Sequence, residues 1–98
     1  SLRLSASMTV PGEFALYQCY PNPFNPVTTI EYTLPSRLKA VIRIYNILGE
    51  EIATLLDETE DAGVHRVAFD ATHLSSGIYF YRLQAGQHSA IKKMVLIK

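Results

Sequence analysis

The sequence TTIEYTLPSRLKAVIRIY, residues 28–45, contains two apolar–polar alternations separated by a Pro-Ser turn. Apolar residues recur at every second position, as expected for one face of an extended chain: Ile30, Tyr32 and Leu34 in the first run, and Ala40, Ile42 and Ile44 in the second. β-Branched and aromatic side chains with this period are typical of half-buried strands. We therefore predict two consecutive strands here.

Similar short segments follow along the rest of the chain. Residues 51–56 also have helical spacing, but their shortness and the preceding turn at Gly49 favour a strand. Residues 77–84, GIYFYRLQ, are apolar on both faces for much of their length, which is typical of a central strand covered on both sides. Two more strands are expected at residues 64–69 and 91–97. The pattern predicts an all-β fold: an immunoglobulin-like or fibronectin III-like sandwich of about seven antiparallel strands.

Length and composition are those of a single domain. A chain of 98 residues that is 48% hydrophobic can bury a core without disulfides or metals. Nine basic and nine acidic residues give no net charge, which disfavours binding to nucleic acid. No run of about 18 apolar residues occurs, so no insertion into a membrane is expected. Residues 1–13 are expected to be a linker that precedes the folded residues 14–98, and the start at Ser1 suggests a piece of a longer precursor.

Potential catalytic and metal-binding residues are scattered. His65, His73 and His88 lie on three separate segments and share no metal-ligand spacing with Cys19. The acidic run at residues 57–63 does not have the glycine placement of a calcium loop, and we predict a solvated loop there. We therefore expect neither an enzyme nor a bound cofactor or metal.

A proline-rich segment, YPNPFNP, occupies residues 20–26. Proline fixes φ and removes a backbone donor, and it pushes the preceding residue into an extended conformation. Pro21, Pro23 and Pro26 therefore predict a rigid strap that does not pair as a regular strand. Tyr20 and Phe24 are expected to bury their rings and pin the strap to one end of the sandwich, where it would cover an exposed sheet edge.

Residues 70–79, DATHLSSGIY, have the pattern of a tyrosine corner. Tyr79, at the start of a late strand, is expected to turn its hydroxyl back onto the backbone a few residues upstream. Leu74 is expected to fill the core below the crossing, and Gly77 to let the chain bend. Asp70 is expected to accept hydrogen bonds from amides of the loop.

Taken together, these segments resemble a known family. The order of the motifs is that of the type A C-terminal sorting domain of the bacterial type IX secretion system: YPNPFNP and a Thr-rich strand, IYNILG at residues 44–49, FDATHLSSGIY at 69–79 and KKMV at 92–95. The resemblance covers residues 14–98. Cys19 departs from the family, which more often has asparagine there. The immunoglobulin-like domain of the flagellar hook-capping protein is similar in its core strands.

The resemblance implies a secretion signal. Such a domain directs a fused cargo protein across the outer membrane of a Gram-negative bacterium, from the periplasm to the cell surface. The implied partners are the type IX machinery, the N-terminal cargo and a sortase-like peptidase that cleaves in the linker before Phe14. The matching recognition region is Gly77, Tyr79, Lys92, Lys93, Met94 and Val95.

Two other functions are compatible with a sandwich of this kind, because fold alone does not decide function. One is an accessory carbohydrate-binding or spacer module of an extracellular enzyme, with an aromatic platform formed by Tyr17, Tyr45, Phe80 and Tyr81. The chain contains no tryptophan, which weakens this interpretation. The other is a structural assembly domain like that of the hook cap.

Overall fold

The computed structural model describes residues 13–98, and the prediction of a linker at residues 1–13 falls almost entirely outside them. The described residues form seven strands, all paired antiparallel. These are β1 (Ala15–Leu16), β2 (Val27–Leu34), β3 (Leu38–Tyr45), β4 (Glu51–Glu60), β5 (Gly63–Asp70), β6 (Gly77–Ala85) and β7 (His88–Leu96). In this part of the chain no helix is long and apolar enough to cross a membrane.

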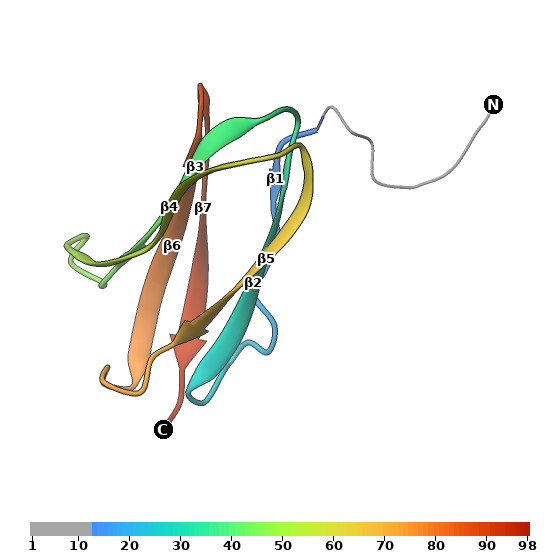
Figure 1. Ribbon diagram of the computed structural model, residues 1–98. Helices are drawn as coiled ribbons and strands as arrows, with labels where there is room; N and C mark the ends of the chain where they lie inside the picture. The colour runs from blue at the N-terminus through green and yellow to red at the C-terminus, as the bar shows by residue number, and fades with distance from the viewer. Residues whose placement is uncertain (1–12) are drawn as a thin grey trace.

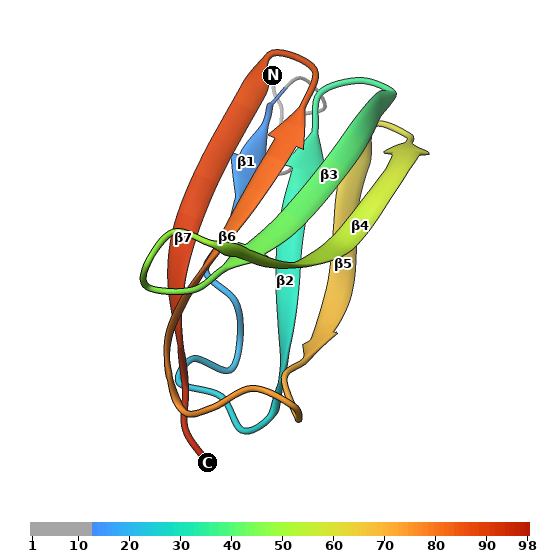
Figure 2. The ribbon, with the colours of Figure 1, turned by 90° about the vertical axis from the view of Figure 1, so that its left-hand side faces the viewer.

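The strands form two sheets that face each other (Figure 1). One sheet has the order β1-β2-β5 and the other the order β4-β3-β6-β7. Turned so that the four-stranded sheet is in front, the molecule shows the three-stranded sheet directly behind it (Figure 2). This architecture confirms the predicted immunoglobulin-like β-sandwich.

The core lies between the two sheets and is built from alternate residues of each strand. All the apolar positions of residues 28–45 noted in the sequence are buried. Tyr81 and Leu83 on β6 and Met94 on β7 complete this layer with no exposed surface. Burying side chains of this size contributes roughly 1.5–3 kcal/mol each, which is why the period of two determines the fold.

β4 explains the ambiguous spacing of residues 51–56. Ile42 pairs with Leu56 and the next residue, Arg43, pairs with Thr54, so Leu55 is an extra residue opposite the partner strand. Such a bulge shifts the alternation by one position. Leu55 and Leu56 can therefore both pack against the core although they are adjacent in sequence.

The prediction of a solvated acidic loop at residues 57–63 is wrong over most of that range. β4 continues to Glu60, which pairs with Leu38 at the start of β3. The Tyr32 hydroxyl of the other sheet donates a hydrogen bond to the Glu60 carboxylate. Pairing with β3 and this bond between the sheets hold the acidic run extended, and the turn is confined to Asp61 and Ala62.

The position of β6 was predicted correctly, but the covering of both its faces was not. β6 lies between β3 and β7, as expected for a central strand. Its outward residues Ile78, Arg82 and Gln84 are nevertheless exposed, and Phe80 is half-buried. The described residues form only two layers, so the outer face of the four-stranded sheet has no third layer against it.

Candidate functional site

The strap runs along the outer edge of β7 and uses its non-proline residues to bind that edge. The Phe24 amide donates to the Val95 carbonyl, and the Ile97 amide donates to the Phe24 carbonyl, both at 2.9 Å. The Asn22 side-chain oxygen accepts a hydrogen bond from the Val95 amide at 2.9 Å. The strap therefore closes the edge of the last strand, which would otherwise be free to pair with another chain.

The prolines of the strap face away from this pairing, and two of them supply acceptors to the rest of the fold. The Thr28 hydroxyl donates to the Pro21 carbonyl at 2.7 Å, and the Ala71 amide donates to the Pro26 carbonyl at 2.9 Å. Pro23 is exposed. The strap pairs only through isolated bridges at Tyr20 and Phe24, so it touches two strands without forming a regular strand itself.

Phe24 is buried as predicted, but Tyr20 is not. Phe24 is 2% exposed and lies near Phe69, with ring centroids 6.2 Å apart. Tyr20 is 82% exposed. The backbone of Tyr20 pairs with Thr29 of β2, and alternation along this extended segment turns Cys19 inward and Tyr20 outward.

A buried tyrosine holds the residues that connect β1 to the strap. The Tyr81 hydroxyl accepts a hydrogen bond from the Cys19 amide at 2.8 Å and donates one to the Tyr17 carbonyl at 2.7 Å. Burial raises the pKa of the Tyr81 phenol, so it remains a donor. This role was not predicted. The available signal was the alternation in GIYFYRLQ, which places Tyr81 on the same inner face as Tyr79 and Leu83.

The tyrosine corner has the expected geometry. The Tyr79 hydroxyl donates to the Ser75 carbonyl at 2.7 Å. Leu74 packs against the core beneath the loop, and Gly77 begins β6. The Asp70 carboxylate accepts hydrogen bonds from the amide and the hydroxyl of Thr72, at 2.9 and 2.5 Å. The loop between β5 and β6 is therefore held at both ends.

The hydrogen bonds that the Asp70 carboxylate accepts predict that the stability of the domain depends on pH. Its two hydrogen bonds from Thr72 lower the pKa of Asp70 below the ordinary value of 3.8. The stabilisation is therefore present in full above pH 3.8 and is lost as the pH falls through the lower pKa of the folded state. Melting temperatures of the wild type and Asp70→Ala should differ at pH 7 and converge near pH 2. A difference that persists unchanged at pH 2 would show that the carboxylate charge is irrelevant.

The structure brings the residues of the implied recognition region together on the β6–β7 hairpin but turns them in different directions. Tyr79 pairs with Met94, and both side chains face the core. Met94 has no exposed surface, and in the folded domain its side chain packs in the core. Lys93 is exposed on the outer face, whereas Lys92 and Val95 are partly buried.

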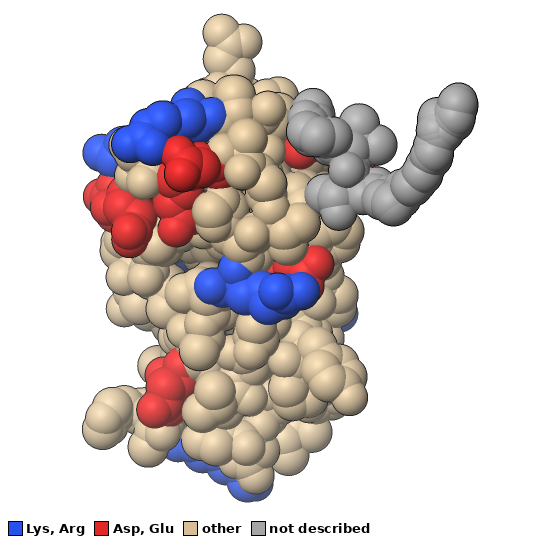
Figure 3. Space-filling view, turned by 45° about the vertical axis from the view of Figure 1, so that its right-hand side comes forward, with Lys and Arg blue, Asp and Glu red and all other residues tan. Residues whose placement is uncertain are grey.

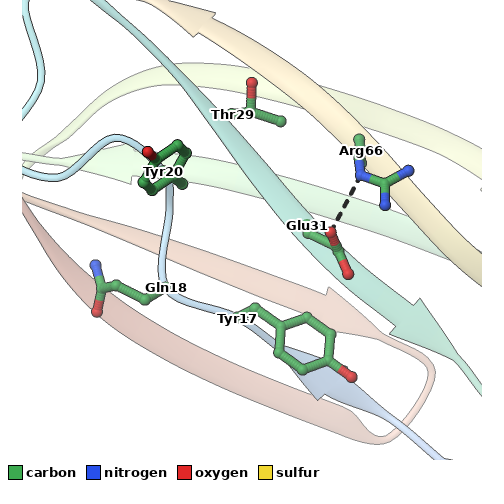
Figure 4. Close-up of a pocket in the computed structure, with 6 residues that line it drawn as sticks. All are labelled: Tyr17, Gln18, Tyr20, Thr29, Glu31 and Arg66. Carbon is green, nitrogen blue, oxygen red and sulfur yellow. Dashed lines mark hydrogen bonds and ion pairs between the residues drawn. The ribbon is translucent and has the colours of Figure 1, made fainter. Parts of the chain in front are cut away.

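The outer side of the three-stranded sheet carries a pocket of about 370 Å³ between residues 17–20 and the strands β2 and β5 (Figure 4). It is lined by Tyr17, Gln18, Tyr20, Thr29, Glu31 and Arg66. Glu31 and Arg66 form an ion pair at 3.1 Å, so their charges compensate each other. Seen from this side, the centre of the face carries few other charges (Figure 3).

The aromatic platform considered from the sequence does not form. Tyr81 is in the core, and Tyr17 lies on the side of the three-stranded sheet. Tyr45 and Phe80 pair with each other on the outer face of the four-stranded sheet. Four aromatic residues that lie on two faces and in the interior cannot stack on one ligand. Within residues 13–98, moreover, no three histidine, cysteine or acidic side chains lie close enough to hold a metal ion.

Comparison with known proteins identifies the family. Residues 18–98 match the model of the secretion system C-terminal sorting domain. The chain belongs to this family. The sorting-domain family is a non-catalytic secretion signal of the type IX system, and membership implies that the parent protein is secreted or exposed at the cell surface.

A solved structure supports the fold of this sorting domain. PorZ, a surface component of the type IX secretion system of Porphyromonas gingivalis, contains a similar region with a TM-score of 0.59 and 18% sequence identity. The match covers 85% of this chain and 11% of that chain, so the sorting domain spans about a tenth of the PorZ length. At this identity the likeness shows the fold. No curated protein matches the sequence.

Proposed function

We propose that residues 14–98 direct a fused cargo protein across the outer membrane through the type IX machinery and to the cell surface. The match of residues 18–98 to the sorting-domain family is the observation that carries this proposal. The cargo precedes the sandwich and reaches the machinery from the periplasm. A sortase-like peptidase then cleaves the chain before Phe14.

The geometry suits a signal that is read as a folded unit. The strap, which lies early in the domain, pairs with β7, which is the last strand. The Gln18 amide donates to the Lys93 carbonyl at 2.7 Å and adds a further bond along this edge. Both parts must therefore be present and folded before the outer edge of β7 is closed. This arrangement supports recognition of a complete domain rather than of a short linear peptide.

A fusion experiment tests the proposed function. Residues 14–98 are joined to a periplasmic reporter in a host with a type IX system, and surface protease accessibility of the reporter is measured. We expect the reporter to reach the surface in the wild-type host and to stay in the periplasm when the secretion system is deleted. Retention of the intact, folded fusion in the competent host would contradict the proposal.

The two lysines of β7 are the first residues to test within this fusion. We expect Lys92→Ala combined with Lys93→Ala to reduce export of the reporter while the free energy of unfolding changes by less than about 0.5 kcal/mol. The matched control is Arg37→Ala with Lys39→Ala, which removes two bases near the start of β3. Export at the wild-type level in the Lys92 and Lys93 variant would mean that these lysines are only solvated.

A further inference from the structure

A partner protein can contact the side chains of β7 more easily than its backbone edge, because part of that edge is already hydrogen-bonded. The edge groups of Val95 and Ile97 are hydrogen-bonded to the strap, and the Lys93 carbonyl is hydrogen-bonded to Gln18, just before it. Addition of a partner strand at this stretch would have to displace those bonds. Recognition of β7 in the folded domain therefore depends on the outer face of the four-stranded sheet, which points away from the three-stranded sheet and in front of which only the β3–β4 hairpin passes (Figure 2).

The strand register determines which side chains form this face. Outward positions of β3, β6 and β7 lie directly opposite one another, in the rows Tyr45–Phe80–Lys93, Arg43–Arg82–Ile91 and Ile78–Val95. We call these eight residues the basic face. Ile91 is 58% exposed and Ile78 is 37% exposed, so apolar surface lies beside the cationic groups.

Arg43 and Arg82 form an unfavourable pair at the centre of this face. Like charges directly opposite each other on neighbouring strands destabilise a sheet. Arg43 has a carboxylate partner, Glu51, at 3.5 Å. Arg82 instead donates a hydrogen bond to the neutral hydroxyl of Ser89 at 3.0 Å. Arg82 therefore has no carboxylate partner to offset the positive charge opposite it on β3.

The outer side of the sheet also carries more bases than acids. Its strands contribute the bases Lys39, Arg43, Arg82 and Lys93 and the carboxylates Glu51 and Asp57. Both carboxylates already contact a base, since Asp57 lies 3.3 Å from Lys39. Among the described residues, Arg82 and Lys93 have no ion-pair partner. An excess of positive charge is thus concentrated on β6 and β7, in a chain whose net charge is zero.

We propose that the basic face docks an acidic segment of a protein in the secretion machinery; this inference rests on the proposed function. Carboxylates of the segment lie over Arg82 and Lys93 and relieve the repulsion between Arg43 and Arg82. Apolar groups of the segment cover Ile78, Phe80 and Ile91. A narrow segment over β6 and β7 avoids Glu51 and Asp57, whereas a broad anionic membrane surface would also meet these carboxylates.

Arg82→Gln tests the proposal because it separates stability from docking. Glutamine keeps a donor for Ser89 and removes the charge opposite Arg43. We expect the melting temperature of the 98-residue chain to rise by about 1–4 °C. Export of the reporter fusion is expected to fall by about tenfold, and further in Arg82→Glu. A residue with a purely structural role would move both readouts in the same direction.

Two matched variants complete the experiment. Arg82→Lys retains the charge and should keep export near the wild-type level. Arg66→Gln removes an exposed base from the other sheet and should leave export unchanged.

Four outcomes would overturn the inference. Export at the wild-type level in both Arg82→Gln and Arg82→Glu would overturn the docking proposal and leave the proposed function intact. Failure of the wild-type fusion to be exported would overturn both the docking proposal and the proposed function. A fall in melting temperature for Arg82→Gln would show that the arginine pair is not repulsive. Co-sedimentation of the 98-residue chain with phosphatidylglycerol vesicles, lost in Arg82→Glu, would identify a lipid surface as the partner.

Discussion

Phe24→Ala should lower the free energy of unfolding by about 3–5 kcal/mol, measured by urea denaturation. The Phe24 ring is 2% exposed, and it fills the end of the core beside Phe69. Its backbone forms one hydrogen bond with Val95 of β7 and one with Ile97, just after the strand, so a cavity here also weakens the pairing of the strap with the last strand. Because small domains have total stabilities of about 5–15 kcal/mol, this one change removes a large part of the stability.

Tyr20→Ala is the matched control in the same strap. Its ring is 82% exposed, so the variant should change the free energy of unfolding by less than about 0.5 kcal/mol. Equal losses for the two variants would show that both rings are buried and would contradict the orientation of the strap. Export of the reporter fusion should follow the same order, with Phe24→Ala exported poorly and Tyr20→Ala exported as efficiently as the wild type.

Tyr81→Phe should destabilise the domain by about 1–3 kcal/mol although it removes a single oxygen atom. The hydroxyl satisfies two backbone groups in the segment before the strap, the amide of Cys19 and the carbonyl of Tyr17. Cys19 is 2% exposed, so its amide would be left in the core without an acceptor. Amide hydrogen exchange at Cys19 should accelerate far more than exchange at the centre of β6, which keeps its ladder bonds.

Tyr79→Phe provides the comparison, because it removes a phenolic oxygen from the same strand and the same face. Its hydroxyl donates one bond, to the Ser75 carbonyl, and that carbonyl belongs to an exposed residue. We expect a smaller loss, of about 0.5–1.5 kcal/mol. A loss for Tyr79→Phe that exceeds the loss for Tyr81→Phe would show that the corner, rather than the Tyr81 hydroxyl, is the main anchor.

Much of the fold follows from local sequence pattern. Ile30, Tyr32 and Leu34 share a face in any extended chain, and burying them requires a second sheet. The tyrosine corner was also predictable, because its bond from Tyr79 to Ser75 joins residues four positions apart. The family was identified from motifs in a fixed order, and the match over residues 18–98 confirms it.

Contacts between residues far apart in the chain could not be predicted from the sequence. The bulge at Leu55 depends on how β4 pairs with β3, and it makes a strand look partly helical. The burial of Phe24 and the exposure of Tyr20 depend on which strands the strap meets. The bonds from Tyr81 to Cys19 and Tyr17 span more than 60 residues of sequence.

The sequence by itself therefore determined the two-sheet architecture, the tyrosine corner and the family, because each rests on periodicity or on short spacing. Only the tertiary structure decided that the edge of β7 is closed by the strap and that Arg43 lies opposite Arg82. Both facts depend on strand register, which joins segments that are far apart in the chain. Register is set by the packing of the whole core, and no single segment encodes it.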